Sequence, residues 1–128
     1  MPSRAQAVRQ RGADTTKALA RAAARSLRRA GLDAVAVPAL RLCRATSDSA
    51  GLTAGARMVN VSGAMTADLR HLPDDREDAI VVVDDLLTTG ATLTEAARAL
   101  AAVGRPVTAA AVVAATLRRG VGLAACAR

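Results

Sequence analysis

The residues best suited to chemistry lie in one short stretch, IVVVDDLLTTGATLTE, at residues 80–95. Two acids, Asp84 and Asp85, follow a run of branched apolar residues, and a threonine-rich turn leads from them into the expected start of a helix. The unpaired N–H groups of a helix start favour an anion such as phosphate, and Gly90 lets the backbone turn tightly beside it. Two carboxylates next to this turn would repel a lone phosphate, so the ligand must also offer them something neutral.

A sugar phosphate meets both requirements, because carboxylates accept charge-assisted hydrogen bonds from hydroxyl groups. A ribose 5-phosphate would place its 2- and 3-hydroxyls against Asp84 and Asp85. Its phosphate would lie in the turn formed by Thr88, Thr89, Gly90, Ala91 and Thr92. The alternative is that the acids only end a strand and the threonines only cap a helix. The stretch has neither the lysine of a Walker A loop nor the G-x-G-x-x-G pattern of a dinucleotide fold.

The elements that must position this stretch are predicted by its hydrophobic pattern. Residues 79–83, AIVVV, form a continuous apolar run that is typical of a strand buried on both faces. Residues 92–103 are expected to form a helix, opened by a capping box of Thr92 and Glu95 and ended by the glycine that follows. Residues 105–116, RPVTAAAVVAAT, predict a second buried strand. The order predicts an α/β fold with a mostly parallel sheet and flanking helices, and a ligand site at the carboxyl ends of its strands.

The first half of the chain begins with an amphipathic pattern. In residues 14–31, apolar side chains fall on one side of a helix and five basic side chains fall on the other. Asp14 or Thr15 can cap the start of this helix, and Gly31 can end it. We therefore expect a helix that lies on the core with its basic face outward.

The segments between this helix and the acidic stretch carry weaker signals. Residues 34–42, AVAVPALRL, predict a strand, to which Pro38 is a mild objection. Residues 43–64 have no sustained period and three glycines, so we expect a loop with one helical turn. Residues 65–71, MTADLRH, predict a short strand.

Composition limits the class of protein. The 128 residues are expected to form a single domain, residues 1–128, with a tail at residues 119–128. The chain is 52% hydrophobic but contains no Phe, Tyr or Trp, so its core of small side chains should give modest stability. Neither a membrane-spanning run nor the apolar part of a signal peptide is present, which favours a cytoplasmic protein. Cys43 and Cys126 have no metal-type spacing, and Cys43 is expected to be a buried apolar residue.

The net charge of +7 is unevenly distributed. Residues 1–44 carry ten basic and two acidic side chains, whereas residues 45–128 are close to neutral. A basic segment of this kind can contact nucleic-acid phosphates, although it can equally be a solvated helix face. Without aromatic side chains the segment cannot stack single-stranded bases, so any DNA contact would be electrostatic.

The stretch VVVDDLLTTGAT, residues 81–92, resembles the phosphoribosyl pyrophosphate (PRPP) motif of type I phosphoribosyltransferases. Two further segments are similar to the ComF-like family, which is associated with competence for DNA uptake. RQRGADTTKALARA, residues 9–22, resembles its R-x-R-G-F-N segment, and residues 44–65 resemble its loop ending in R-x-x-N-V-x-G-A-F. The resemblance covers roughly residues 2–118.

This resemblance implies a five-stranded parallel sheet that binds PRPP and Mg²⁺ at its carboxyl edge. Asp84 and Asp85 would act on the ribose hydroxyls, and residues 43–64 would form a mobile loop over the site. The candidate contacts to pyrophosphate are Ser3, Arg4, Arg44 and Arg57. Mg²⁺ would bind through ligand oxygens and water rather than directly to the protein. The reaction would transfer the phosphoribosyl group to an acceptor and release pyrophosphate.

Departures from the family pattern leave the activity open. The family's first core strand and its Cys-rich zinc module are missing, which suggests an N-terminal truncation. Thr88 stands where enzymes acting on 6-oxopurines carry an acid, and no aromatic residue can stack on a nucleobase. A non-catalytic PRPP-sensing regulator and a DNA-contacting protein are therefore alternatives to an enzyme. The acceptor, and whether the chain forms a homodimer, stay open.

Overall fold

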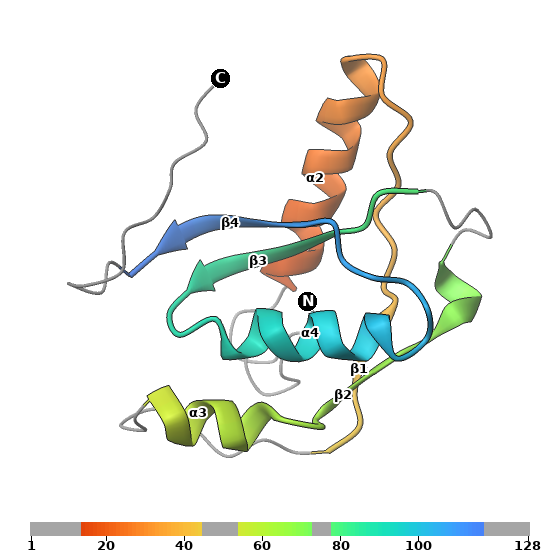
Figure 1. The fold of residues 1–128 in the computed structure, drawn as a ribbon. Coiled ribbons are helices and arrows are strands. Elements are labelled where there is room, and N and C mark those ends of the chain that lie inside the picture. Colours follow the sequence, from red (N-terminus) through yellow and green to blue (C-terminus); the bar gives the residue numbers. More distant parts are fainter. Residues whose placement is uncertain (1–13, 45–53, 73–77, 117–128) are drawn as a thin grey trace.

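The computed structural model describes residues 14–44, 54–72 and 78–116, which form helices and strands in alternation (Figure 1). In chain order the elements are α2 (Thr15–Arg29), β1 (Leu40–Leu42), α3 (Ala54–Val61), β2 (Met65–Ala67), the 3₁₀ turn η1 (Leu69–His71), β3 (Val81–Leu87), α4 (Ala91–Ala101) and β4 (Ala109–Ala115). None of the helices in these ranges is long and apolar enough to cross a membrane. Ser3, Arg4, Cys126 and the predicted tail lie outside the described residues.

Strand β3, helix α4 and strand β4 form the predicted parallel βαβ unit, which gives the α/β fold class. The two strands pair in parallel from Val81 opposite Ala109 to Leu87 opposite Ala115. The expected strand at 79–83 is thus longer, because ladder pairing continues through Asp84, opposite Val112, to the end of β3. The acids therefore lie within the strand rather than after it.

Helix α4 begins earlier than the capping box predicted. Gly90 is its N-cap, with a positive φ of 77° and no side-chain cap hydrogen bond. The predicted reciprocal cap of Thr92 and Glu95 is wrong, because the Glu95 carboxylate instead accepts a hydrogen bond from the distant Met65 N–H. The end of the helix agrees with the prediction, since a turn after Ala101 leads to Gly104, whose φ is +74°.

A second, antiparallel ribbon joins β1 and β2, with Leu40 opposite Ala67 and Leu42 opposite Met65. The strand predicted over 34–42 is therefore confirmed only in its last three residues. Residues 32–39 belong to no strand, and Val35 is 62% exposed. A strand needs a neighbour to accept and donate its hydrogen bonds, and none of the described strands lies beside residues 34–37. The strands in the described residues thus form two separate pairs rather than the five-stranded sheet that the resemblance implies.

The intervening segments are more ordered than their sequence indicated. Within the expected loop at 43–64, α3 is an eight-residue helix rather than a single turn. The strand predicted at 65–71 is limited to β2, and a 3₁₀ turn replaces its second half. Asp68 begins this turn, since its carboxylate accepts the N–H of Arg70 at 3.1 Å.

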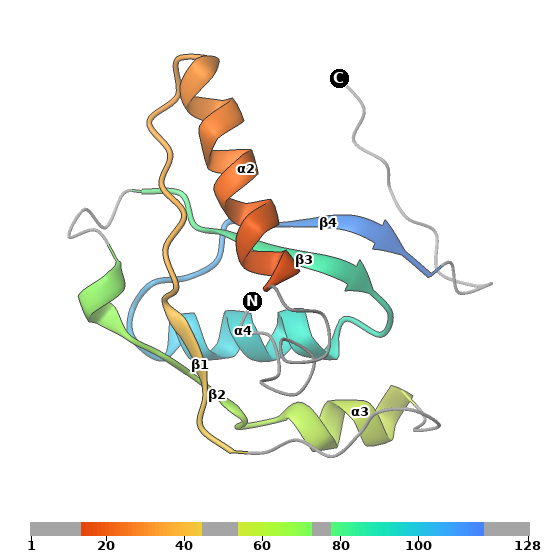
Figure 2. The same ribbon diagram turned by 180° about the vertical axis from the view of Figure 1, so that it is seen from behind.

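Helix α2 agrees with the predicted amphipathic helix. Asp14 caps it by accepting the N–H of Lys17 at 3.1 Å, and Gly31 follows its end with φ +86°. All five of its basic side chains are exposed, as expected. The apolar side is buried less than predicted, because only Thr16 and Ala24 in this helix are buried. Helix α2 packs on β3 and lies across it in Figure 2.

The core surrounds α4, which packs against both pairs of strands and α3. Its buried members are Val61, Met65, Val82, Ala96, Ala99 and Leu100. These side chains are small or medium in size, as the composition predicted. The expectation that β4 is buried is wrong, since six of its seven residues are exposed and Val113 is 69% exposed. Apolar composition alone does not bury a strand when no described element covers it.

Candidate functional site

Asp84 and Asp85 lie side by side near the carboxyl end of β3, and both are half-buried. Successive side chains of a strand point to opposite faces, so Asp84 shares the face of Val82, which belongs to the core around α4. The Asp84 carboxylate turns back to accept the backbone N–H of Asp85 at 3.1 Å. The two acids therefore lie on opposite faces of β3, within its last four residues.

Burial raises the pKa of Asp84 above its ordinary value, and the neighbouring Asp85 charge adds to the shift. The backbone hydrogen bond from Asp85 opposes the shift without cancelling it. Both causes disfavour the ionised form, so the folded protein holds this carboxylate at a cost. Neutral hydroxyl donors from a ligand would reduce that cost, since they stabilise a carboxylate without bringing a further negative charge.

The turn at residues 88–92 leads directly from the acidic pair into α4. Gly90 adopts the left-handed conformation that only glycine takes without strain, and its carbonyl accepts the first helical bond, from Thr94 N–H at 2.9 Å. The Thr89 hydroxyl oxygen accepts the Ala91 N–H at a long 3.4 Å. The first turn of α4 thus directs backbone N–H groups toward the carboxyl edge of the sheet without a strong side-chain cap. This is the geometry in which a helix start binds phosphate.

Thr116 supports this turn from the end of β4, a role that the sequence did not reveal. Its backbone N–H donates to the Leu87 carbonyl at 2.9 Å. Its hydroxyl lies 3.4 Å from the same carbonyl and 3.5 Å from that of Thr88. A threonine after an apolar run gives no sequence signal for this contact, because its partners are nearly thirty residues earlier.

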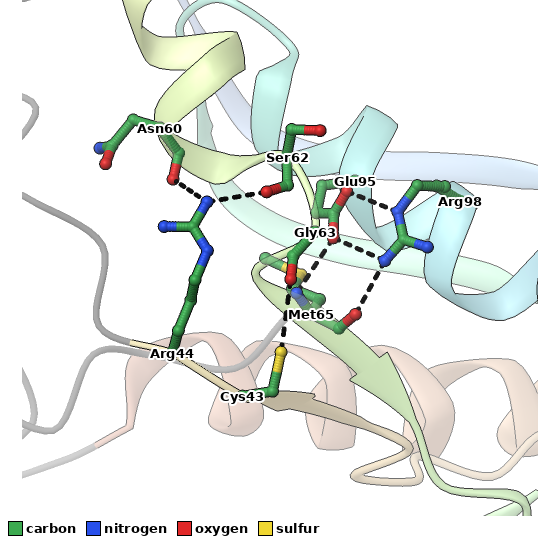
Figure 3. A network of polar contacts seen from close by, with 8 residues as sticks. All are labelled: Cys43, Arg44, Asn60, Ser62, Gly63, Met65, Glu95 and Arg98. Atoms are coloured by element: carbon green, nitrogen blue, oxygen red, sulfur yellow. Dashed lines mark hydrogen bonds and ion pairs between the residues drawn. The ribbon is translucent and has the colours of Figure 1, made fainter.

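A second cluster of polar contacts surrounds the turn between α3 and β2 (Figure 3). Arg44 donates from one guanidinium nitrogen to the carbonyls of Asn60, at 3.0 Å, and Ser62, at 2.7 Å. These carbonyls lie at the C-terminal end of α3, where a cation also complements the helix dipole. The Cys43 thiol donates to the Gly63 carbonyl at 3.4 Å and is exposed, so the expectation of a buried Cys43 is wrong.

Glu95 and Arg98 attach the same turn to α4. The Arg98 guanidinium makes two hydrogen bonds of 2.8 Å to the Glu95 carboxylate and a third, of 2.9 Å, to the Met65 carbonyl. Glu95 accepts the Met65 N–H at 3.0 Å and is only 4% exposed. Sequence reasoning assigned Glu95 to a local cap and did not single out Arg98, because their partner lies some thirty residues away.

The candidate site residues divide into three groups. The acidic pair and the five residues of the turn lie together at the carboxyl end of β3. Arg44 lies elsewhere, since it is held at the C-terminal end of α3. Arg57 is part of α3, but its side chain lies outside the described part, as do Ser3 and Arg4. Within the described residues, no group of three or more metal-ligating side chains comes together.

Comparison with known proteins gives a family match. A family model described as the phosphoribosyl transferase domain matches residues 16–124, a range that contains the acidic pair, the turn and both flanking elements. Neither the curated proteins nor the solved structures include a significant match. Because the family model spans most of its length, the chain belongs to the phosphoribosyl transferase domain family.

Proposed function

We propose that the protein binds PRPP at the carboxyl end of β3. The observation that carries this proposal is the direct succession of two half-buried acids, a left-handed glycine and a helix start without a side-chain cap. The family match supports phosphoribosyl transfer in general, and the ligand is inferred from the chemistry of these residues. The 5-phosphate is bound by residues 88–92, and the ribose hydroxyls are bound by Asp84 and Asp85.

Mg²⁺ is the metal that fits this set of donors. Carboxylate oxygens suit a hard cation, and Asp84 and Asp85 would hold it near the ligand through water or ligand hydroxyls. When bound, Mg²⁺ would offset negative charge on the diphosphate. The carboxylates of Asp84 and Asp85 would orient the ribose.

The proposed reaction replaces pyrophosphate at C1 of the ribose. The bond from C1 to the pyrophosphate oxygen breaks, a bond from C1 to the acceptor forms, and pyrophosphate leaves with the bonding electrons. The sugar becomes cation-like as the bond breaks, and the nearby carboxylates stabilise that charge. Thr88 offers no acid to handle a base proton, so 6-oxopurines are disfavoured as acceptors. A ComF-like branch, suggested by residues 9–22 and 44–65, is consistent with a different acceptor.

Two other functions each have an observation in their favour. The complete lack of aromatic side chains leaves nothing to stack on a nucleobase, which favours a regulator that senses PRPP without turnover. The exposed basic side of α2 favours a contact with nucleic-acid phosphates. Pyrophosphate release that depends on an added acceptor separates enzyme from sensor. DNA binding that weakens steeply with salt and is unchanged in Asp84→Asn would favour the nucleic-acid contact.

Calorimetric titration of PRPP with Mg²⁺ tests the proposal. We expect saturable binding to the wild type and at least a tenfold weaker affinity in the Asp84→Asn/Asp85→Asn variant, since a hydrogen bond to a charged group contributes roughly 1.5–3 kcal/mol. Asp68→Asn is the matched control, because this carboxylate directly follows the C-terminal residue of β2, outside the proposed site, and pairs with Arg70 at 2.8 Å. No binding by a folded wild type, or equal binding by the variant and the control, would reject the proposal.

A further inference from the structure

Two threonines flank β4, one at each end, and both contact β3 or the residue before it. Thr108 precedes β4: its backbone N–H donates to the Ile80 carbonyl at 2.9 Å, and its hydroxyl oxygen accepts the Ile80 N–H at 3.2 Å. Thr116 follows β4, and its backbone N–H donates to the Leu87 carbonyl at 2.9 Å. Because β3 and β4 run in parallel, Thr116 lies at the carboxyl ends of both strands, next to the turn into α4 (Figure 1). Thr108 lies at the opposite ends.

The hydroxyl of Thr116 reaches one residue further than its backbone, into the turn at residues 88–92. It lies 3.4 Å from the Leu87 carbonyl oxygen and 3.5 Å from the Thr88 carbonyl oxygen. Carbonyl oxygens only accept, so the hydroxyl must donate, and its single proton is shared between the two. Sharing agrees with the length of both contacts, since an unshared O–H···O bond is shorter. Without the hydroxyl, the Leu87 carbonyl would keep its backbone hydrogen bond, but the Thr88 carbonyl would lose its contact with Thr116.

A carbonyl that is held in place also fixes the N–H of the residue that follows it. The peptide unit is planar and trans, so its C=O and N–H bonds point in opposite directions. The contacts of Thr116 with the two carbonyls therefore direct the N–H groups of Thr88 and Thr89 away from Thr116. Within the described ranges, neither N–H donates a hydrogen bond to another group of the protein. Both are thus available to an anion at this turn.

We propose that Thr116 is a positioning residue for the turn at residues 88–92, whose hydroxyl orients the peptide between Thr88 and Thr89 so that the Thr89 N–H meets the 5-phosphate of the ligand. The inference rests on the proposed function and deepens it, and it gives Thr116 no contact with the ligand. A donor that is already oriented loses little freedom when the phosphate binds, so this orientation raises affinity. The same hydroxyl adds little to folding, because Thr116 is exposed and water can replace its contacts. Its loss should therefore weaken binding more than it weakens folding.

Calorimetric titration of ribose 5-phosphate and of PRPP, each with Mg²⁺, tests this role in the full chain. Thr116→Val keeps the shape of the side chain and removes the hydroxyl. We expect its Kd to rise about fivefold for both ligands, because both carry the 5-phosphate and one hydrogen bond to the turn is lost. Thr116→Ser should restore the wild-type affinity, since serine keeps the donor.

Thr108→Val is the matched control, because it removes a hydroxyl at the opposite end of the same strand. It leaves the Ile80 N–H without its acceptor, so it should destabilise the protein in urea denaturation at least as much as Thr116→Val does. Its affinity for both ligands should nevertheless equal that of the wild type. The two variants therefore separate a loss of stability from a loss of binding.

Amide NMR follows the same interaction at the donor. The Thr89 amide proton of the wild type should move downfield when ribose 5-phosphate is added, as expected for a hydrogen bond to a charged group. No such shift, an unchanged affinity in Thr116→Val, an equal loss in Thr108→Val, or a failure of Thr116→Ser to restore binding would overturn the positioning role and leave the proposed function intact. Binding of neither ligand by the folded wild type would overturn the proposed function, and the positioning role with it.

Discussion

Gly90 connects the acidic strand to α4, and the structure predicts how a side chain at this position would act. Its φ of 77° lies in the left-handed region, where an L residue costs roughly 1–2 kcal/mol. A Cβ placed there would meet only the Leu87 Cδ1 atom, at 3.9 Å, which is an ordinary van der Waals contact. The cost of Gly90→Ala is therefore conformational and not steric. We expect the free energy of unfolding to fall by about 1–2 kcal/mol.

Urea denaturation followed by circular dichroism measures this difference, and two variants make it specific. Gly55→Ala changes a glycine inside α3 that has no positive φ and open space around it, so it should stabilise the protein by roughly 0.5–1 kcal/mol. Gly90→Asn should cost less than Gly90→Ala, because asparagine tolerates the left-handed conformation. An unchanged stability in Gly90→Ala beside a stabilised Gly55→Ala, or an equal loss for Asn and Ala, would refute the argument from backbone strain.

Three further predictions concern single side chains. The pKa of Asp84 is raised in the folded protein, so the contribution of this carboxyl group to stability falls as pH rises from its ordinary pKa of 3.8 toward the folded value. The variant Asp84→Asn should therefore have a higher free energy of unfolding at pH 7, while it binds the ligand more weakly. Glu95 has the opposite sign: its stabilisation is complete above its ordinary pKa of 4.5 and is lost as pH falls toward about 2, and Glu95→Gln should remove that part of the acid dependence in pH-dependent denaturation. Thr116→Val should cost under about 1 kcal/mol in urea denaturation, because its hydroxyl contacts are long; a larger loss would mean that the hydroxyl contributes more than its geometry implies.

Sequence patterns predicted the βαβ unit because it depends on neighbours along the chain. Within sixteen residues, a run of valines indicates a strand, and the threonine–glycine turn after the two acids indicates the end of that strand and the start of a helix. Where the outcome depended on a partner in space, prediction failed. Residues 34–37 have the composition of a strand but lack a described neighbour, and β4 is apolar but uncovered. Burial and pairing are properties of the assembled fold, so periodicity alone could not supply them.

Glu95 illustrates the same limit at the level of the site. Glu95 lies three residues after Thr92, which is the spacing of a capping box, and the N-cap of α4 lies two residues before the Thr92 that this spacing predicts. The carboxylate nevertheless turns away from the backbone of its own helix, because Arg98 and the Met65 N–H together offer a buried charge more than one exposed cap can. A long-range contact has replaced a local one.

Glu95 and the Asp84–Asp85 pair differ in how the protein stabilises their negative charge. Both sets are withdrawn from water, but Glu95 has two charged hydrogen bonds from Arg98 and a lowered pKa, whereas Asp84 has a backbone bond, a like-charged neighbour and a raised pKa. Folding alone would favour an apolar residue in place of Asp84, since apart from Asp85 the other residues of β3 are valine and leucine. A carboxylate that lowers the stability of its own strand, beside a helix start suited to phosphate, fits the ligand proposed above, whose hydroxyl groups would donate to it. The raised pKa of Asp84 and its half-buried position therefore support the proposed sugar phosphate together with the family match.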